Sequence, residues 1–221
     1  MQARLTVFLL FVGGPATAHP HVFIDTSVTA VLDAQGRLAA LRLRWDYDDY
    51  VSLLLVEEKG ADTDGDGQVS ASEMSVLNGF DMAWGDTFDG DTKVMQDGSD
   101  LPLTKGPQNW SSGWQDGHLW SEHTRVLTAP VDLSVGPVTV LVHDDTDYTA
   151  YTYTGAAILQ DGTASSQPSA CRIEVLGPGD TAPDGFLQTI GLFMFGSERV
   201  STTLPAPSES EGPAIRLTCD G

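Results

Sequence analysis

The sequence has few basic residues. Eleven Lys and Arg residues stand against 31 Asp and Glu residues in a chain of 221, and the formal net charge at pH 7 is −20. A surface with this balance repels nucleic acid and anionic lipid and favours divalent cations. Nucleic-acid binding is therefore excluded as a function, and metal ions are the partners that the charge favours.

The sequence also lacks the short motifs that carry most hydrolytic and phosphate-transfer chemistry. It contains no G-x-S-x-G, no H-E-x-x-H, no catalytic cysteine signature and no glycine loop that could cradle a phosphate. Hydrolytic chemistry would have to depend on the histidines alone. We therefore expect a protein that is not an enzyme.

Long hydrophobic runs are confined to the N-terminus. Arg4 precedes the apolar run of residues 5–12, and Ala16-Thr17-Ala18 is an A-x-A cleavage signature. This pattern predicts a secretory signal peptide over residues 1–18, too short to span a membrane. The mature chain, residues 19–221, is expected not to span a membrane.

Cysteine is scarce too. Cys171 and Cys219 are the only two, and they lie far apart in the sequence. An exported chain with an even number of cysteines is typically disulfide-bonded, so we expect one Cys171–Cys219 bridge. Two free, buried thiols are the alternative.

The most informative pattern that is present is the calcium-loop motif D-x-D-x-D-G-x5-E at residues 62–73. Such a loop offers oxygen ligands at its positions 1, 3, 5, 7, 9 and 12 and needs glycine at position 6, which is Gly67 here. The candidate Ca²⁺ ligands are Asp62, Asp64, Asp66, the Gln68 carbonyl, Ser70 through a water, and Glu73. The alternative is an acidic, glycine-rich turn without an ion.

The remaining pattern predicts an α+β fold. Alternating or β-branched runs indicate strands at residues 22–32, 37–45, 93–99, 118–128, 138–142, 148–159, 171–175 and 214–219. Residues 50–59 and residues 70–79 have helical spacing, and residues 186–195 form a short helix or an apolar strand. We expect one mostly antiparallel, sandwich-like β domain with an inserted EF-hand helix-loop-helix at about residues 48–80.

Histidine is the candidate ligand for a transition metal, because imidazole suits zinc, nickel and cobalt. Cleavage after Ala18 would place His19 and His21 at the mature N-terminus. His143, beside two aspartates, is the preferred third ligand, with His118 and His123 behind it. The latter two are five residues apart, which puts them on opposite faces of a strand. A mobile polar terminus and ordinary surface histidines are the alternatives.

Three motifs together resemble the DUF1007 family of exported bacterial proteins. They are His-Pro-His-Val-Phe-Ile-Asp from His19, Leu-Arg-Leu-Arg-Trp from Leu41 followed by Asp-Tyr-Asp-Asp-Tyr, and the Asp-Thr-Asp-Gly-Asp-Gly loop. His19 and His21 match the family's His-Pro-His, whereas Phe23 replaces a common Trp. The resemblance implies a periplasmic protein that assists a membrane transporter of a metal such as zinc, nickel or cobalt.

Two functions follow from these observations. The first is a periplasmic metal-binding accessory protein of a transition-metal transport system, with a structural Ca²⁺ in the EF-hand loop and a separate Zn²⁺, Ni²⁺ or Co²⁺ site at the histidines. The second is a calcium-stabilised interaction or adhesion module outside the cytoplasm that has no role with transition metals.

Overall fold

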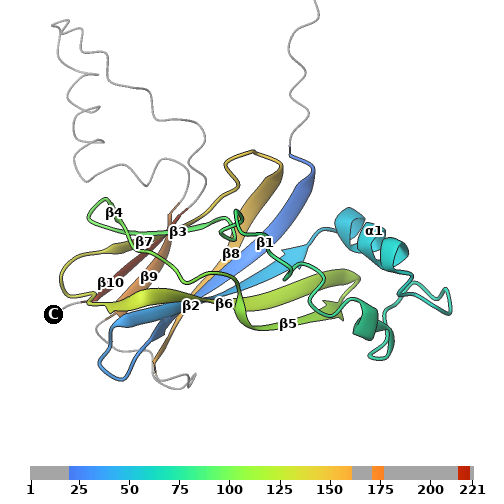
Figure 1. Cartoon of the computed structure of the whole chain (residues 1–221), viewed down its shortest axis with the longest axis horizontal. Helices are drawn as coiled ribbons and strands as arrows, with labels where there is room; N and C mark the ends of the chain where they lie inside the picture. The colour runs from blue at the N-terminus through green and yellow to red at the C-terminus, as the bar shows by residue number, and fades with distance from the viewer. Residues whose placement is uncertain (1–19, 161–170, 177–213, 220–221) are drawn as a thin grey trace, which may run out of the picture.

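The structure is a computed structural model that describes residues 20–160, 171–176 and 214–219. These residues form two five-stranded sheets (Figure 1). The first sheet has the strand order β5 (Gln108–Gln115), β6 (His118–Val131), β2 (Leu38–Tyr47), β1 (Val22–Leu32) and β8 (Thr149–Gln160). The second has the order β4 (Ser99–Asp100), β3 (Thr92–Gln96), β7 (Val138–Val142), β10 (Ala214–Cys219) and β9 (Cys171–Leu176).

β1 and β2 form the predicted antiparallel hairpin at the centre of the first sheet. Alternate β1 residues from Ile24 to Leu32 are buried, because successive side chains of a strand point to opposite faces. The other edge of β1 pairs with β8 in parallel, so the first and last strands of this sheet along the chain lie side by side. This pairing places the start of β8 beside the start of β1.

The buried side chains fall into two clusters. The larger one joins the two sheets through apolar residues of β1, β2, β7 and β10, which include Leu41, Val140 and Ile215. The smaller one lies near α1 (Asp49–Lys59) and includes Trp45, Val69 and Leu77. The segment after α1 is therefore attached to the sheet by its own apolar residues.

The predicted α+β class is wrong: the fold is an all-β, sandwich-like one. Within the described residues α1 is the one α-helix, and the predicted helix over residues 70–79 is only a 3₁₀ turn, η1 (Glu73–Val76). The insertion is therefore not a helix-loop-helix. Serine and asparagine, which favour caps and turns over helix interiors, are frequent in this segment, and η1 already ends at its cap residue Leu77.

The predicted disulfide is confirmed. Cys171 and Cys219 are bonded and lie opposite one another in the β9–β10 ladder. The bridge fits a protein located outside the cytoplasm. In the described part of the chain there is no helix with the length and hydrophobicity to cross a bilayer. The predicted signal peptide and the predicted apolar element at residues 186–195 lie outside the described residues.

Candidate metal centre

The 62–73 loop begins where α1 ends, beyond one end of the strands (Figure 1). Asp48 caps the N-terminus of α1 by accepting a hydrogen bond from the Val51 N–H at 2.8 Å, as the predicted aspartate cap requires. Gly60 ends the helix with a φ of 59°, a left-handed conformation that suits glycine. Ala61, which has no exposed surface, then fixes the entry to the loop.

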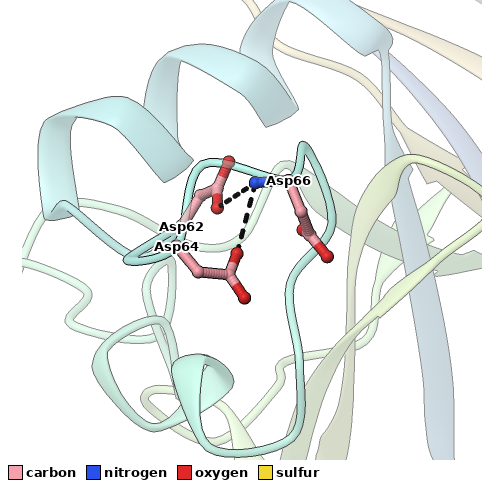
Figure 2. Close-up of side chains that lie close together, drawn as sticks. All are labelled: Asp62, Asp64 and Asp66. Atoms are coloured by element: carbon pink, nitrogen blue, oxygen red, sulfur yellow. Dashed lines mark hydrogen bonds between the residues drawn. The ribbon is translucent and has the colours of Figure 1, made fainter.

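Three aspartates of the loop converge. Asp62, Asp64 and Asp66 each offer a carboxylate oxygen, and these oxygens lie within 4.8 Å of one another. Figure 2 shows the Asp66 N–H directed between the carboxylates of Asp62 and Asp64, to which it donates at 3.2 Å each. Asp62 also accepts from the N–H groups of Gly65 and Gly67, at 2.8 and 3.0 Å. The backbone thus holds the first carboxylate in place.

Glu73, the last residue of the loop, closes it through hydrogen bonds. One carboxylate oxygen accepts from the Thr63 N–H and hydroxyl, both at 2.7 Å, and the other accepts from the Ser70 N–H and hydroxyl at 2.9 and 2.7 Å. These bonds, those from the Thr63 and Ser70 hydroxyls first, lower the pKa of Glu73 to about 2. The carboxylate is therefore ionised at neutral pH, as a calcium ligand must be.

Two apolar residues, one in the loop and one just after it, pack against the sheet. Val69 is 8% exposed and Leu77 is fully buried, and both belong to the cluster around Trp45. In the Ca²⁺-binding pattern, residue 69 is the one that points away from the ion. The loop geometry and the set of hard oxygen donors therefore fit Ca²⁺.

The candidate histidines do not form a group of three potential metal ligands among the described residues. His19 lies outside the described residues, and the His21 ring packs on Tyr148 with 5.1 Å between centroids. His118 is partly exposed at the start of β6. Its Nδ1 lies 3.0 Å from the carbonyl oxygen of Tyr47, the last residue of β2, and its Nε2 lies 3.1 Å from Asp49.

His123 lies on the opposite face of β6 and is completely buried. Its ring meets Trp45 and Trp84 edge-on, and neither ring nitrogen has a hydrogen-bond partner within the described residues. Burial, together with the nearby charge of Arg125, lowers the pKa of His123 to about 3. The imidazole is therefore neutral at physiological pH.

His143 lies at a cavity of about 620 Å³ that sequence reasoning missed. The backbone N–H of His143 donates a hydrogen bond to the backbone carbonyl oxygen of Asp91 at 2.8 Å. Val22, the neighbour of His21, lines the same cavity, together with Asp81 and Asp91. Burial raises the pKa of Asp81, and burial followed by nearby aspartates raises the pKa of Asp91 to about 6. No local motif marks this cavity, because its walls come from distant parts of the chain.

The comparisons place the chain in a family without giving it an activity. A search of the curated proteins returns no match. The family model described as a protein of unknown function (DUF1007) matches residues 4–188, which is most of the chain. The protein therefore belongs to the DUF1007 family.

Proposed function

We propose that this protein is an extracytoplasmic metal-binding accessory protein of a transition-metal transport system, and that it holds a structural Ca²⁺ in the 62–73 loop. The observation that carries the calcium part is the convergence of the Asp62, Asp64 and Asp66 carboxylates within 4.8 Å. The Cys171–Cys219 bridge supports a location outside the cytoplasm. The proposal assigns no reaction to the protein.

In this proposal the ion is held by six groups of the loop. The ligands are the carboxylates of Asp62, Asp64, Asp66 and Glu73, the Gln68 carbonyl, and Ser70 through a water. Ca²⁺ would compete with Thr63 and Ser70 for the oxygens of Glu73, since both of these residues now donate to them. The loop is thus closed by hydrogen bonds without the ion and by coordination with it.

The ion has a structural role in this proposal. A sensor EF-hand opens by moving one helix against another, whereas this loop is followed by a single 3₁₀ turn, and Leu77 after it is fully buried. Calcium is abundant outside the cytosol, so a Kd on the order of 10⁻⁴ to 10⁻³ M is sufficient.

Calcium titration of the mature, disulfide-bonded chain tests this part. We expect one Ca²⁺ per chain, and we expect Glu73→Gln to weaken the binding strongly, because the amide carries no charge and coordinates calcium poorly. Glu58→Gln, an exposed glutamate on α1, is the matched control and should leave the affinity unchanged. Equal calcium binding by the wild type, Glu73→Gln and Glu58→Gln would show that the 62–73 loop is not the calcium site.

We place the transition-metal site at the end of the molecule where β1 begins. The support is that His143 and Val22, which follows His21, line one cavity. His19, His21 and His143 are then the ligands, and a membrane metal transporter is the partner. His118 is held by Tyr47 and Asp49 at a different pocket, so it serves as the control residue.

Zinc or nickel binding by protein with its processed N-terminus tests this site. The double variant His19→Ala, His21→Ala should lose the metal, whereas His118→Ala should retain it. The protein must carry no tag before His19, because a tag would block the terminal amine. An unchanged zinc stoichiometry in the double variant would refute the transition-metal role while leaving the calcium loop untouched.

A second candidate function is a calcium-stabilised interaction or adhesion module. One observation favours it: α1 presents Tyr50, Leu53 and Leu54 to solvent, with exposed fractions of 71%, 63% and 47%. Exposed apolar residues at helical spacing are typical of surfaces that contact partners. If this second function is the correct one, calcium should raise the melting temperature and zinc should leave it unchanged. The absence of a zinc effect distinguishes it from the first proposal.

A further inference from the structure

The cavity at His143 has a wall of aromatic rings, and we take it as a binding site in its own right. Trp45, Tyr47, Tyr151 and Phe88 line it, and the ring centroids of Trp45 and Tyr151 are 5.8 Å apart. Its volume of about 620 Å³ lies within the range of small-molecule sites. The shape therefore has room for an organic ligand beside His143.

Two aspartates in this cavity are each held by a tyrosine. The Tyr47 hydroxyl donates to Asp81 at 2.6 Å, and the Tyr151 hydroxyl donates to Asp91 at 2.7 Å. Burial, then the negative charge of Asp91, with smaller contributions from Asp144 and Asp81, raises the pKa of Tyr151 well above its usual value. The two tyrosine–aspartate pairs thus lie in one electrostatic environment.

The other three aspartates of the cavity are already engaged. Asp144 accepts hydrogen bonds from Thr146 and Thr149, and Asp89 accepts one from the Asp91 N–H. Both carboxylate oxygens of Asp145 lie 2.9 Å from the Lys93 ammonium. All five carboxylates thus have partners, and Asp81 and Asp91 are the two that lie against the aromatic wall, because Tyr47 and Tyr151 donate to them.

Buried polar atoms at the cavity wall lack partners. Asp81 Oδ1 is buried without a hydrogen-bond partner within the described residues, and so is Nε1 of Trp45, a residue that is only 3% exposed. A buried carboxylate oxygen without a donor is costly, because it loses its hydration and gains nothing in return. Within the described residues the Asp81 charge is therefore compensated mainly through its other oxygen, which accepts from the Tyr47 and Ser121 hydroxyls.

The charge of the cavity selects a cation. Five aspartates line the cavity, whereas its only basic lining residues in the described part of the chain are Lys93 and His143. The Lys93 ammonium donates to Asp145. The carboxylates of the cavity do not form a tight set, since among the described residues only the three loop aspartates gather within 4.8 Å. Carboxylates spread around an aromatic wall suit an organic cation, because ammonium groups also bind to aromatic faces.

We propose that this cavity binds a small organic cation with alkylammonium groups, such as an aliphatic diamine. Asp81 and Asp91 are its counter-ions, and the aromatic wall covers its methylene chain. A lysine side chain of a partner protein carries the same chemistry, so the experiment distinguishes a free amine from a peptide. The site lies beyond the calcium loop and does not depend on it.

The test is a calorimetric titration of the mature chain at neutral pH in the presence of a calcium chelator, with 1,4-diaminobutane as the probe. We expect saturable binding that Asp91→Asn weakens about tenfold or more, because the variant loses a charge-assisted hydrogen bond. Asn tolerates the Asp91 φ of 48° and still accepts from Tyr151, so the variant is expected to fold. Phe88→Ala, a change at a half-exposed ring of the cavity wall, should weaken binding without disturbing the core.

The controls separate this site from other acidic surfaces. Asp25→Asn alters the neighbouring acidic pocket and should leave the affinity within about twofold of the wild type. Binding of N-acetyl-lysine amide in place of the diamine assigns the site to a partner's lysine. Equal binding of the neutral 1,4-butanediol, no binding of either amine, or an unchanged affinity in both Asp91→Asn and Phe88→Ala would overturn the proposal.

Discussion

The 62–73 loop and the cavity at His143 are both acidic, but they hold their aspartates by different means. Asp64 and Asp66 are exposed, and the loop's carboxylates accept hydrogen bonds from neighbouring backbone N–H groups. Asp81 and Asp91 are recessed and are held by hydroxyl groups of distant tyrosines. The first arrangement gathers hard oxygens for an ion, whereas the second lines a space for a molecule.

The number of acidic residues does not by itself define a site. In the loop, the partners of each carboxylate are close in sequence, so the twelve-residue segment is sufficient to build the centre. In the cavity, the bonded residues are 34 and 60 positions apart, and only the fold brings them together. Each region should therefore respond to its own perturbation.

The largest expected effect is the loss of the calcium response from the loop alone. With a Kd on the order of 10⁻⁴ to 10⁻³ M, calcium at about 10 mM should raise the melting temperature by about 3–10 °C. Asp62→Ala should abolish this rise, whereas Asp91→Asn should retain it. A calcium response that is lost in Asp91→Asn and kept in Asp62→Ala would reverse the assignment of the two regions.

The next effect concerns pH and the buried His123. Its pKa falls from 6.5 to about 3 on folding, so the unfolded chain binds this proton more tightly, and stability is lost as the pH falls below about 6.5. At about pH 5 the loss is about 2 kcal/mol, or about 4–8 °C in melting temperature.

His123→Leu removes the titrating group and fills a similar volume, so it should lose less stability than the wild type between about pH 7.5 and 5. Thermal unfolding at several pH values measures this difference. His118→Leu, at a partly exposed position, is the control. Identical pH profiles for the wild type and His123→Leu would show that His123 is not buried in the neutral form.

The smallest expected effect is a gain in stability when the buried charge of Asp91 in the cavity is removed. Folding raises the pKa of Asp91 from 3.8 to about 6, mainly through burial, so the folded state holds its proton more tightly. This contribution falls as the pH rises from about 4 through 6, and above that the ionised carboxylate is a cost. Asp91→Asn should therefore raise the melting temperature at neutral pH by about 2–5 °C. A lower melting temperature would mean that an existing partner already compensates the charge.

The sequence predicted the features that depend on neighbouring residues. The β1–β2 hairpin and α1 with its Asp48 cap follow from alternation and capping chemistry. The helix expected over residues 70–79 from apolar spacing does not form, because the serines of this segment favour caps and turns over helix interiors.

The features that were missed depend on contacts between distant segments. β5 is a polar edge strand with the sequence QNWSSGWQ, which has little intrinsic preference for a strand and is held by β6. The parallel pairing of β1 with β8, and the Tyr151–Asp91 contact, have no local signal. The disulfide was predictable because only two cysteines exist in a chain expected to be exported.

The most direct measurement is a crystal structure of the mature chain grown with calcium at about 10 mM. We expect one Ca²⁺ in the loop, bound by Asp62, Asp64, Asp66 and Glu73 at about 2.3–2.6 Å. Glu73 would then exchange its bonds to Thr63 and Ser70 for the ion. A loop without an ion, in which Glu73 keeps those bonds at this calcium concentration, would contradict the account.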